Sequence, residues 1–173
     1  MFNVGDKVMY PMHGAGIISE VEQHEVLGKL KDYYILQMPI GNIIIMMPVG
    51  SINELGIRKL ISKEEIKDVL ESFVSREFIE NANWNKRYRE NIEKLKSASI
   101  YDVADVYKVL AKRDNDKGLS TGERKMFANA RQILFSELIL SGDMKIEEVE
   151  ILVKKALEPY IGKTDTGLKV EGL

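Results

Sequence analysis

Hydrophobic and polar residues alternate along the first sixty residues, with the period of two expected of a strand that has one buried face. The alternation is clearest over residues 17–22, while residues 33–38 and 43–47 are apolar runs rich in β-branched and aromatic side chains. Glycine and proline turns at 27–29 and 39–42 separate these runs. The pattern predicts four or five short antiparallel strands, which suits a small Tudor-like or SH3-like β-barrel.

From residue 62 the apolar residues recur every three or four positions, which is the period of an amphipathic helix. Capping boxes beginning at Ser62 and Ser120 indicate two helix starts, and Asn83 can cap a third helix. The pattern predicts five helices, starting near residues 62, 84, 102, 120 and 145. Pro159 should stop the last one, whose predicted buried residues are Ile146, Val149, Leu152, Val153 and Ala156.

These two periods divide the chain into a β domain over 1–60 and an all-α domain over 61–158. The fold class is therefore α+β, with a bundle of about five helices after the sheet. Residues 159–173 contain glycines among polar residues, and we expect a flexible tail there.

Composition excludes several kinds of chemistry. The chain has no cysteine, so it has neither a disulfide nor a thiolate metal site. His13 and His24 lack partners at a recognisable metal spacing, and no catalytic constellation stands out. Glycines 14 and 16 do not precede a phosphate-binding helix and instead favour a β-bulge or a tight bend. We expect no enzymatic activity, no metal and no cofactor.

The sequence also bears on location. The longest apolar run is far shorter than the roughly 20 residues that span a bilayer. The first six residues lead directly into a strand pattern rather than a signal peptide. We expect a cytoplasmic protein with no membrane partner.

Charge is distributed unevenly along the chain. The net charge is -2, yet residues 84–131 carry 12 Lys/Arg against 7 Asp/Glu, and every other segment is acidic. On the predicted helices these cations lie opposite the apolar stripe. Such a face is either a solvated helix surface or a contact for nucleic-acid phosphates.

Trp84, the only tryptophan, opens this basic region. Its spacing to Tyr88 and Leu95 matches a core stripe, which favours a buried ring. Its position in the first helical turn would instead allow the ring to overhang the helix end, because side chains lean toward the N-terminus. An exposed aromatic ring flanked by cations could insert between bases.

Read as a whole, the chain resembles the CarD family of bacterial transcription regulators. The match begins at residues 4–11 with His13-Gly14 and continues through Asn83-Trp84, Arg87-Tyr88 and residues 92–95. It extends through Arg113-Asp114, residues 117–120, Gly122-Glu123 and residues 130–134. Each piece is weak by itself, but the series in unbroken order over about residues 1–158 is specific.

This resemblance implies a Tudor-like domain that docks on the β subunit of RNA polymerase, partly by adding an edge strand to its sheet. It also implies a helical domain that contacts promoter DNA with little sequence reading, at the upstream edge of the melted region. Carried over by position, Trp84 is the wedge that stabilises the open complex. The implied phosphate contacts are Lys86, Arg87, Arg89 and Arg124, and the implied polymerase contacts are Ile43, Ile45, Met46 and Met47.

The chain departs from the family pattern at one of these positions. Some members have an arginine two residues before the proline that ends the docking strand, whereas Met46 stands there in this chain. Strand alternation predicts that one of Met46 and Met47 is exposed and the other is in the core.

We expect a monomer that reaches the nucleoid through RNA polymerase. Two alternatives stay open at this point. One is a protein-interaction adaptor with a buried Trp84, and the other is a ribosome- or RNA-associated barrel protein.

Overall fold

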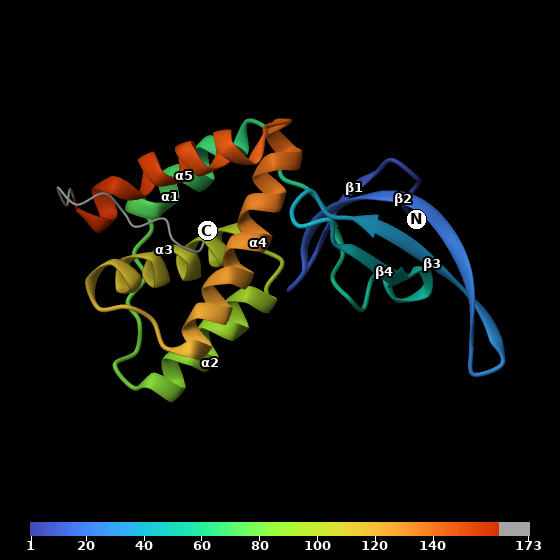
Figure 1. Ribbon diagram of the computed structural model, residues 1–173, viewed down its shortest axis with the longest axis horizontal. Coiled ribbons are helices and arrows are strands. Elements are labelled where there is room, and N and C mark those ends of the chain that lie inside the picture. Colours follow the sequence, from blue (N-terminus) through green and yellow to red (C-terminus); the bar gives the residue numbers. More distant parts are fainter. Residues whose placement is uncertain (163–173) are drawn as a thin grey trace.

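The computed structural model describes residues 1–162 and places a curved sheet at one end and a bundle of helices at the other (Figure 1). We call the sheet with its loops the β module and the helices the helical module. The predicted α+β class is confirmed. The β module contains β1 (Lys7–Tyr10), β2 (Gly14–Val26), β3 (Lys29–Gln37), β4 (Ile44–Pro48), a 3-10 turn η1 (Val49–Ser51) and β5 (Arg58–Lys59).

The five strands form one antiparallel sheet in the order β4-β3-β2-β1-β5, so β4 and β5 are its edges. Strands β2 and β3 are longer than the sequence pattern predicted, and they form a hairpin with a register shift between Ile18 and Glu20. The module has its own core, made of Val8, Ile18, Tyr34, Leu36, Met38 and Met47.

Gly14 and Gly16 lie where β2 approaches other parts of the chain closely. Gly14 has φ +117°, and a Cβ there would lie 2.7 Å from the Ser136 hydroxyl oxygen of the helical module. A Cβ on Gly16 would lie 2.6 Å from Cγ of Leu36 on β3. These glycines therefore permit a bend and tight packing, while the bulge lies further along the strand.

The helical module contains α1 (Glu65–Ser75), α2 (Trp84–Lys96), α3 (Ile100–Asp116), α4 (Thr121–Gly142) and α5 (Ile146–Ile161). The predicted caps at Asn83 and Ser120 are confirmed, whereas the residue before α1 is Glu64 rather than Ser62. The Asn83 side chain accepts from the Lys86 backbone N–H at 3.1 Å, and Ser120 and Glu123 form a complete capping box. Ser62 and Glu65 exchange the same pair of bonds, although the regular helix begins only at Glu65.

The last helix differs from the prediction in two ways. Pro159 lies inside α5, which continues to Ile161, because buried Leu157 and Ile161 hold the final turn against the core while proline removes only one N–H. Leu152 is exposed rather than buried, because the buried face of α5 follows Val149, Val153 and Leu157. The predicted tail therefore cannot begin at 159, and its residues 163–173 lie outside the described part of the chain.

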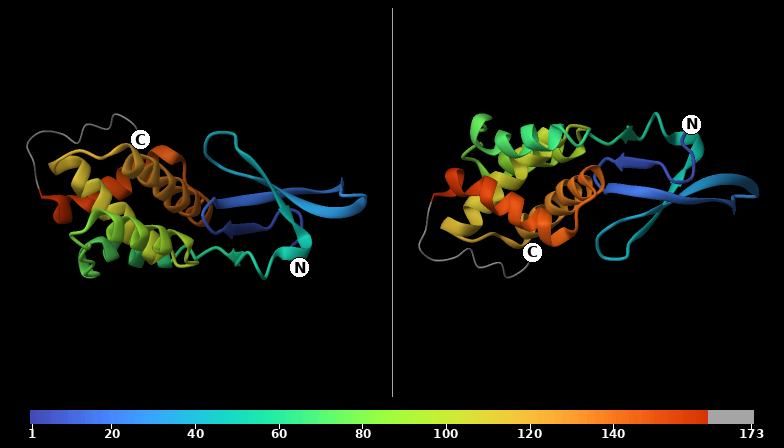
Figure 2. Two further views of the ribbon diagram at one scale, coloured as in Figure 1. Left: turned by 90° about the horizontal axis from the view of Figure 1, so that it is seen from below. Right: turned by 90° about the horizontal axis from the view of Figure 1, so that it is seen from above.

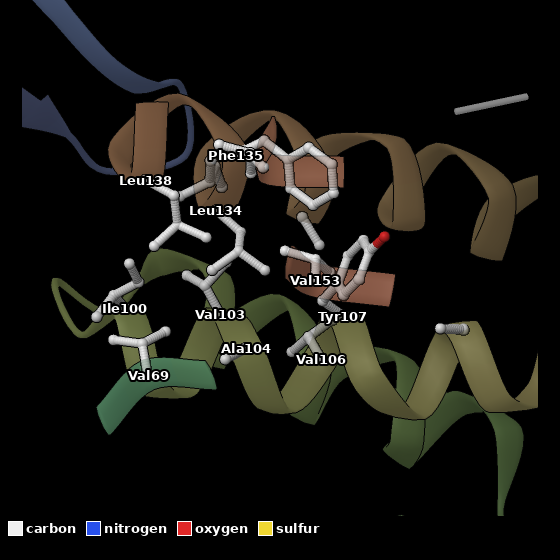
Figure 3. Packing of buried hydrophobic residues seen from close by; sticks show 14 of the residues in the cluster. Val69, Ile100, Val103, Ala104, Val106, Tyr107, Leu134, Phe135, Leu138 and Val153 are labelled. Atoms are coloured by element: carbon white, nitrogen blue, oxygen red, sulfur yellow. The ribbon is translucent and has the colours of Figure 1, made fainter. Parts of the chain in front are cut away.

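Helix α3 lies at the centre of the helical module, with nearly its whole first three turns buried. Figure 3 shows Val103 and Tyr107 directed toward Leu134 and Phe135 of α4, and Val106 and Val153 belong to the same buried cluster. The β1–β2 end of the sheet lies against α4 (Figure 2), and Met9 and Ala15 of these strands belong to the same buried cluster as the helices. None of the helices within residues 1–162 combines the length and apolarity needed to cross a bilayer.

Candidate nucleic-acid interface and docking edge

Trp84 is the first residue of α2 and lies at the surface, with 44% of its area exposed. Its ring stacks on Tyr88 one turn later, at a centroid distance of 5.2 Å and an interplanar angle of 18°. Tyr88 in turn packs against the helical core. The ring is therefore not in the core as the stripe pattern favoured: one face lies on Tyr88, and 44% of the residue's area remains exposed.

The first turn of α4 lies beside this aromatic pair. A Cβ on Gly122 would lie 3.6 Å from Tyr88 and 4.0 Å from Trp84, so a larger side chain there would press on the stack. A small depression next to the pair is lined by Trp84, Arg87, Tyr88, Asn91, Glu123 and Met126. Two helices that are adjacent in space thus support one exposed ring.

Arg87 lies beneath the stack rather than on the surface, with only 12% of its side chain exposed. Its guanidinium donates to the carbonyl oxygens of Asn81 and Ala82 at 3.3 and 3.4 Å. It lies 3.9 Å from a Glu80 carboxylate oxygen and 4.0 Å from one of Glu123. This arrangement does not bring Arg87 to the surface as a phosphate contact requires.

Arg113 of α3 completes this network. It pairs with Glu80 at 2.6 Å and with Glu123 at 3.5 Å. Glu80 also accepts from the Asn91 amide at 3.0 Å. Sequence reasoning missed Glu80 and Arg113 because they are 33 residues apart in the chain, although Arg113 was part of the family resemblance.

Lys86, Arg89 and Arg124 are exposed, as a phosphate contact requires. No carboxylate within residues 1–162 forms an ion pair with any of the three. Arg124 donates only to the Leu119 carbonyl oxygen, at 3.2 Å. These cations are therefore available to an anionic partner near Trp84.

The predicted docking strand lies at the edge of the sheet, where β4 pairs with β3 on one side only. Ile43, Ile44 and Met46 are exposed large apolar side chains, and we call these three the apolar edge. Met47 is fully buried and Ile45 packs against the core of the β module. The alternation prediction is confirmed: the Met47 side chain is not available to a partner, and that of Ile45 is available only in part.

Sequence reasoning missed Ile44, the most exposed member of the apolar edge at 61%. The signal was present, because residues 44 and 46 must share a face of the strand. The predicted polymerase contacts, however, included residues from both faces of the strand.

The two histidines lie apart from these surfaces. His24 is on β2 and pairs with Glu22 at 2.7 Å, while the His13 ring lies 4.4 Å from that of Tyr10. Partial burial lowers the pKa of His13. Over residues 1–162 the structure contains no group of three or more His, Cys, Asp or Glu side chains that could hold a metal ion.

Comparison with known proteins agrees with this architecture. Residues 2–61 match the model of the CarD-like/TRCF RID domain, and residues 68–154 match that of the CarD C-terminal domain. The chain belongs to the CarD family of transcription factors, and its β module is Tudor-like. It is 36% identical over 138 residues to the "Putative transcription factor YdeB" of Bacillus subtilis strain 168, which covers 80% of this chain and 90% of that protein.

Proposed function

We propose that this protein docks on the β subunit of RNA polymerase and stabilises the open promoter complex by wedging Trp84 into DNA at the upstream edge of the melted region. The observation that carries the proposal is the exposed Trp84 ring, stacked on Tyr88 at the start of α2. Exposed Lys86 and Arg89 lie on the same helix.

The geometry of the ring suits insertion at a base step. Unstacking a step costs a few kcal/mol, and the cost is smallest where the duplex is already opening. The Tyr88 stack and the adjacent first turn of α4 hold the ring before DNA arrives, so little side-chain freedom is lost on binding. A wedge of this kind favours melted over closed DNA.

Phosphate contacts in this proposal come from Lys86, Arg89 and Arg124. All three are exposed, whereas Arg87 is held in the network beneath the stack. Arginine and lysine contacts to phosphate carry no sequence information. We therefore expect little discrimination between promoter sequences by this face.

Polymerase docking in this proposal uses the outer edge of β4. An unpaired edge strand can add to a partner's sheet through backbone hydrogen bonds, while alternate side chains fill pockets. Ile44 and Met46 share the exposed face and supply apolar contacts where some family members have an arginine. Docking makes the DNA contact intramolecular, so weak intrinsic DNA affinity suffices for a chain of net charge -2.

The test is the lifetime of the open complex on a ribosomal-type promoter with cognate RNA polymerase. Base–aromatic stacking contributes about 1–3 kcal/mol, so Trp84→Ala should shorten the lifetime by about 5- to 150-fold relative to wild type. Ile79→Ala is a matched control, because Ile79 is an exposed apolar residue in the segment before α2. Equal open-complex lifetimes for wild type and Trp84→Ala would contradict the proposed insertion of Trp84 into DNA.

The two alternatives predict other outcomes. The adaptor hypothesis depended on a buried Trp84, and the observed exposure removes that support. Co-purification with ribosomes rather than with polymerase would favour the RNA-associated hypothesis.

A further inference from the structure

A buried ion pair joins the two modules. Glu137 of α4 is completely buried, and its carboxylate accepts two hydrogen bonds from the Arg58 guanidinium of β5, at 2.6 and 2.9 Å. The same carboxylate accepts from the Ile61 backbone N–H at 3.0 Å. Since Ile61 lies in the segment that connects the modules, Glu137 holds both an edge strand of the sheet and the connection itself.

Arg58 also reaches the helix that carries Trp84. Its Nε donates to the carbonyl oxygen of Ala98, two residues after the end of α2. In the sheet, Arg58 pairs with Met9 of β1. One guanidinium thus links the sheet, the C-terminal part of α4 and the turn after α2.

Further contacts distribute the junction over several points. The Lys7 ammonium lies 3.0 Å from both the Leu140 carbonyl oxygen and the Asp143 carboxylate at the end of α4. The Ala15 backbone N–H donates to the Ser136 hydroxyl at 2.8 Å. Contacts at β1, β2 and β5 together oppose rotation about any single one of them.

Neighbouring domains move relative to one another by default unless their interface is extensive. Here strand residues share the helical core, and a buried carboxylate depends on a partner from the other module. Separating the modules would leave the Glu137 charge without its partner, which is strongly unfavourable. The junction therefore opposes hinge motion.

We propose that the junction locks the two modules into one rigid body, and that Arg58 and Glu137 are positioning residues that set the span from the apolar edge to Trp84. The consequence for transcription rests on the proposed function. With the span set, a docked molecule presents Trp84 at one place on the DNA. A flexible junction would spread it over many positions and lower its effective concentration at the target step.

The first experiment measures rigidity without polymerase or DNA. The chain has no cysteine, so nitroxide labels can be attached at Gln37→Cys in β3 and Lys154→Cys in α5, both exposed positions. Pulsed electron–electron double resonance then gives the distribution of distances between the modules. We expect one narrow distribution in the otherwise unaltered chain and a broadened or second distribution with Arg58→Ala or Glu137→Ala.

Arg131→Ala is the matched control. Arg131 lies on α4, as Glu137 does, and pairs with Glu150 of α5 at 2.8 Å, entirely within the helical module. It should leave the distance distribution narrow. Arg58→Lys keeps the positive charge but loses the bidentate contact with Glu137. It replaces the alanine variants in the distance measurement if circular dichroism shows that they do not fold.

The second experiment measures polymerase binding and open-complex lifetime for the same variants. Arg58→Ala should still bind the isolated β subunit, because the apolar edge is intact. The factor by which it lengthens the open-complex lifetime should be about tenfold smaller than that of wild type. A broad distance distribution in the unaltered chain would overturn the proposal. So would distributions that stay narrow in both Arg58→Ala and Arg58→Lys. If wild type fails to extend the lifetime while the distances behave as expected, only the proposed function fails.

Discussion

Trp84 and Arg87 lie three residues apart on α2, and their environments differ. Trp84 has a surface position supported by one aromatic neighbour, whereas Arg87 is enclosed by carboxylates and backbone carbonyls. Helical periodicity alone could not separate these two environments, because the carboxylates come from the segment before α2 and from α4. At this scale the structure distinguishes a side chain that can reach a partner, Trp84, from one held within the protein, Arg87.

The tyrosine beneath Trp84 provides a direct test of the stack. Tyr88→Ala should free the indole ring, because an aromatic pair contributes about 0.5–1.5 kcal/mol beyond its buried area. As the only tryptophan, Trp84 reports on itself, and we expect red-shifted emission and lower fluorescence anisotropy. Tyr88→Phe keeps the ring and should resemble wild type. Unchanged emission from Tyr88→Ala would contradict the stacked geometry.

Arg87 and Lys86 should respond to substitution in opposite ways. Arg87→Ala leaves Glu80 and Glu123 with fewer partners and should lower the free energy of unfolding by about 1–3 kcal/mol. Lys86→Ala should change it by less than about 0.5 kcal/mol, because the side chain is exposed. In salt titrations of DNA binding, Lys86→Ala should reduce the slope of log affinity against log salt by about 0.9. If Arg87→Ala instead reduced the salt dependence without lowering the free energy of unfolding, Arg87 would be the phosphate contact.

At the scale of elements, strand β4 exposes one face and buries the other. Met46→Arg should change the free energy of unfolding by less than about 0.5 kcal/mol, because that side chain is exposed. Met47→Arg would bury an unpaired charge and should cost about 3–5 kcal/mol. Urea unfolding compares the two variants, and equal losses would mean that the strand register differs.

The turn between α2 and α3 should respond to acid. Burial raises the pKa of Asp102, but the Ser97 hydroxyl and the cations of Lys94 and Arg76 outweigh it and hold the pKa below 3.8. Because the folded pKa is depressed, this stabilisation is complete above about pH 4 and is lost as the pH falls through the folded value. Asp102→Asn should flatten the acid limb of stability measured by urea unfolding against pH. If the free energy of unfolding fell at low pH in the variant just as it does in wild type, other carboxylates would be responsible for acid unfolding.

At the scale of the whole molecule, the modules share buried residues across the junction. Met9 and Ala15 of the sheet pack in the helical core, so the two modules should unfold together. Calorimetry should give one transition for wild type and two, or one broadened, for Glu137→Ala. Arg131→Ala should lower the midpoint yet keep a single transition. Two transitions in wild type would mean that the modules are independent.

Several features followed from the sequence alone. The change of period near residue 62, the caps at Asn83 and Ser120 and the alternation at Met46 and Met47 depend on neighbours a few positions away, so local physics determines them. The same holds for the α+β class. The predicted cationic face is confirmed only in part, because Lys86, Arg89 and Arg124 are exposed, whereas Lys108 of α3 is buried beside Asp105 and Arg131 of α4 is mostly buried beside Glu150.

Tertiary structure decided the remaining features, because they depend on residues far apart in the chain. The exposure of Trp84 follows from where α4 packs, and Arg87 is enclosed because Glu80 and Glu123 converge on it. The final turn of α5 persists past Pro159 because Ile161 has a core to pack against. The junction pair joins positions 79 residues apart, and no local pattern encodes such a contact.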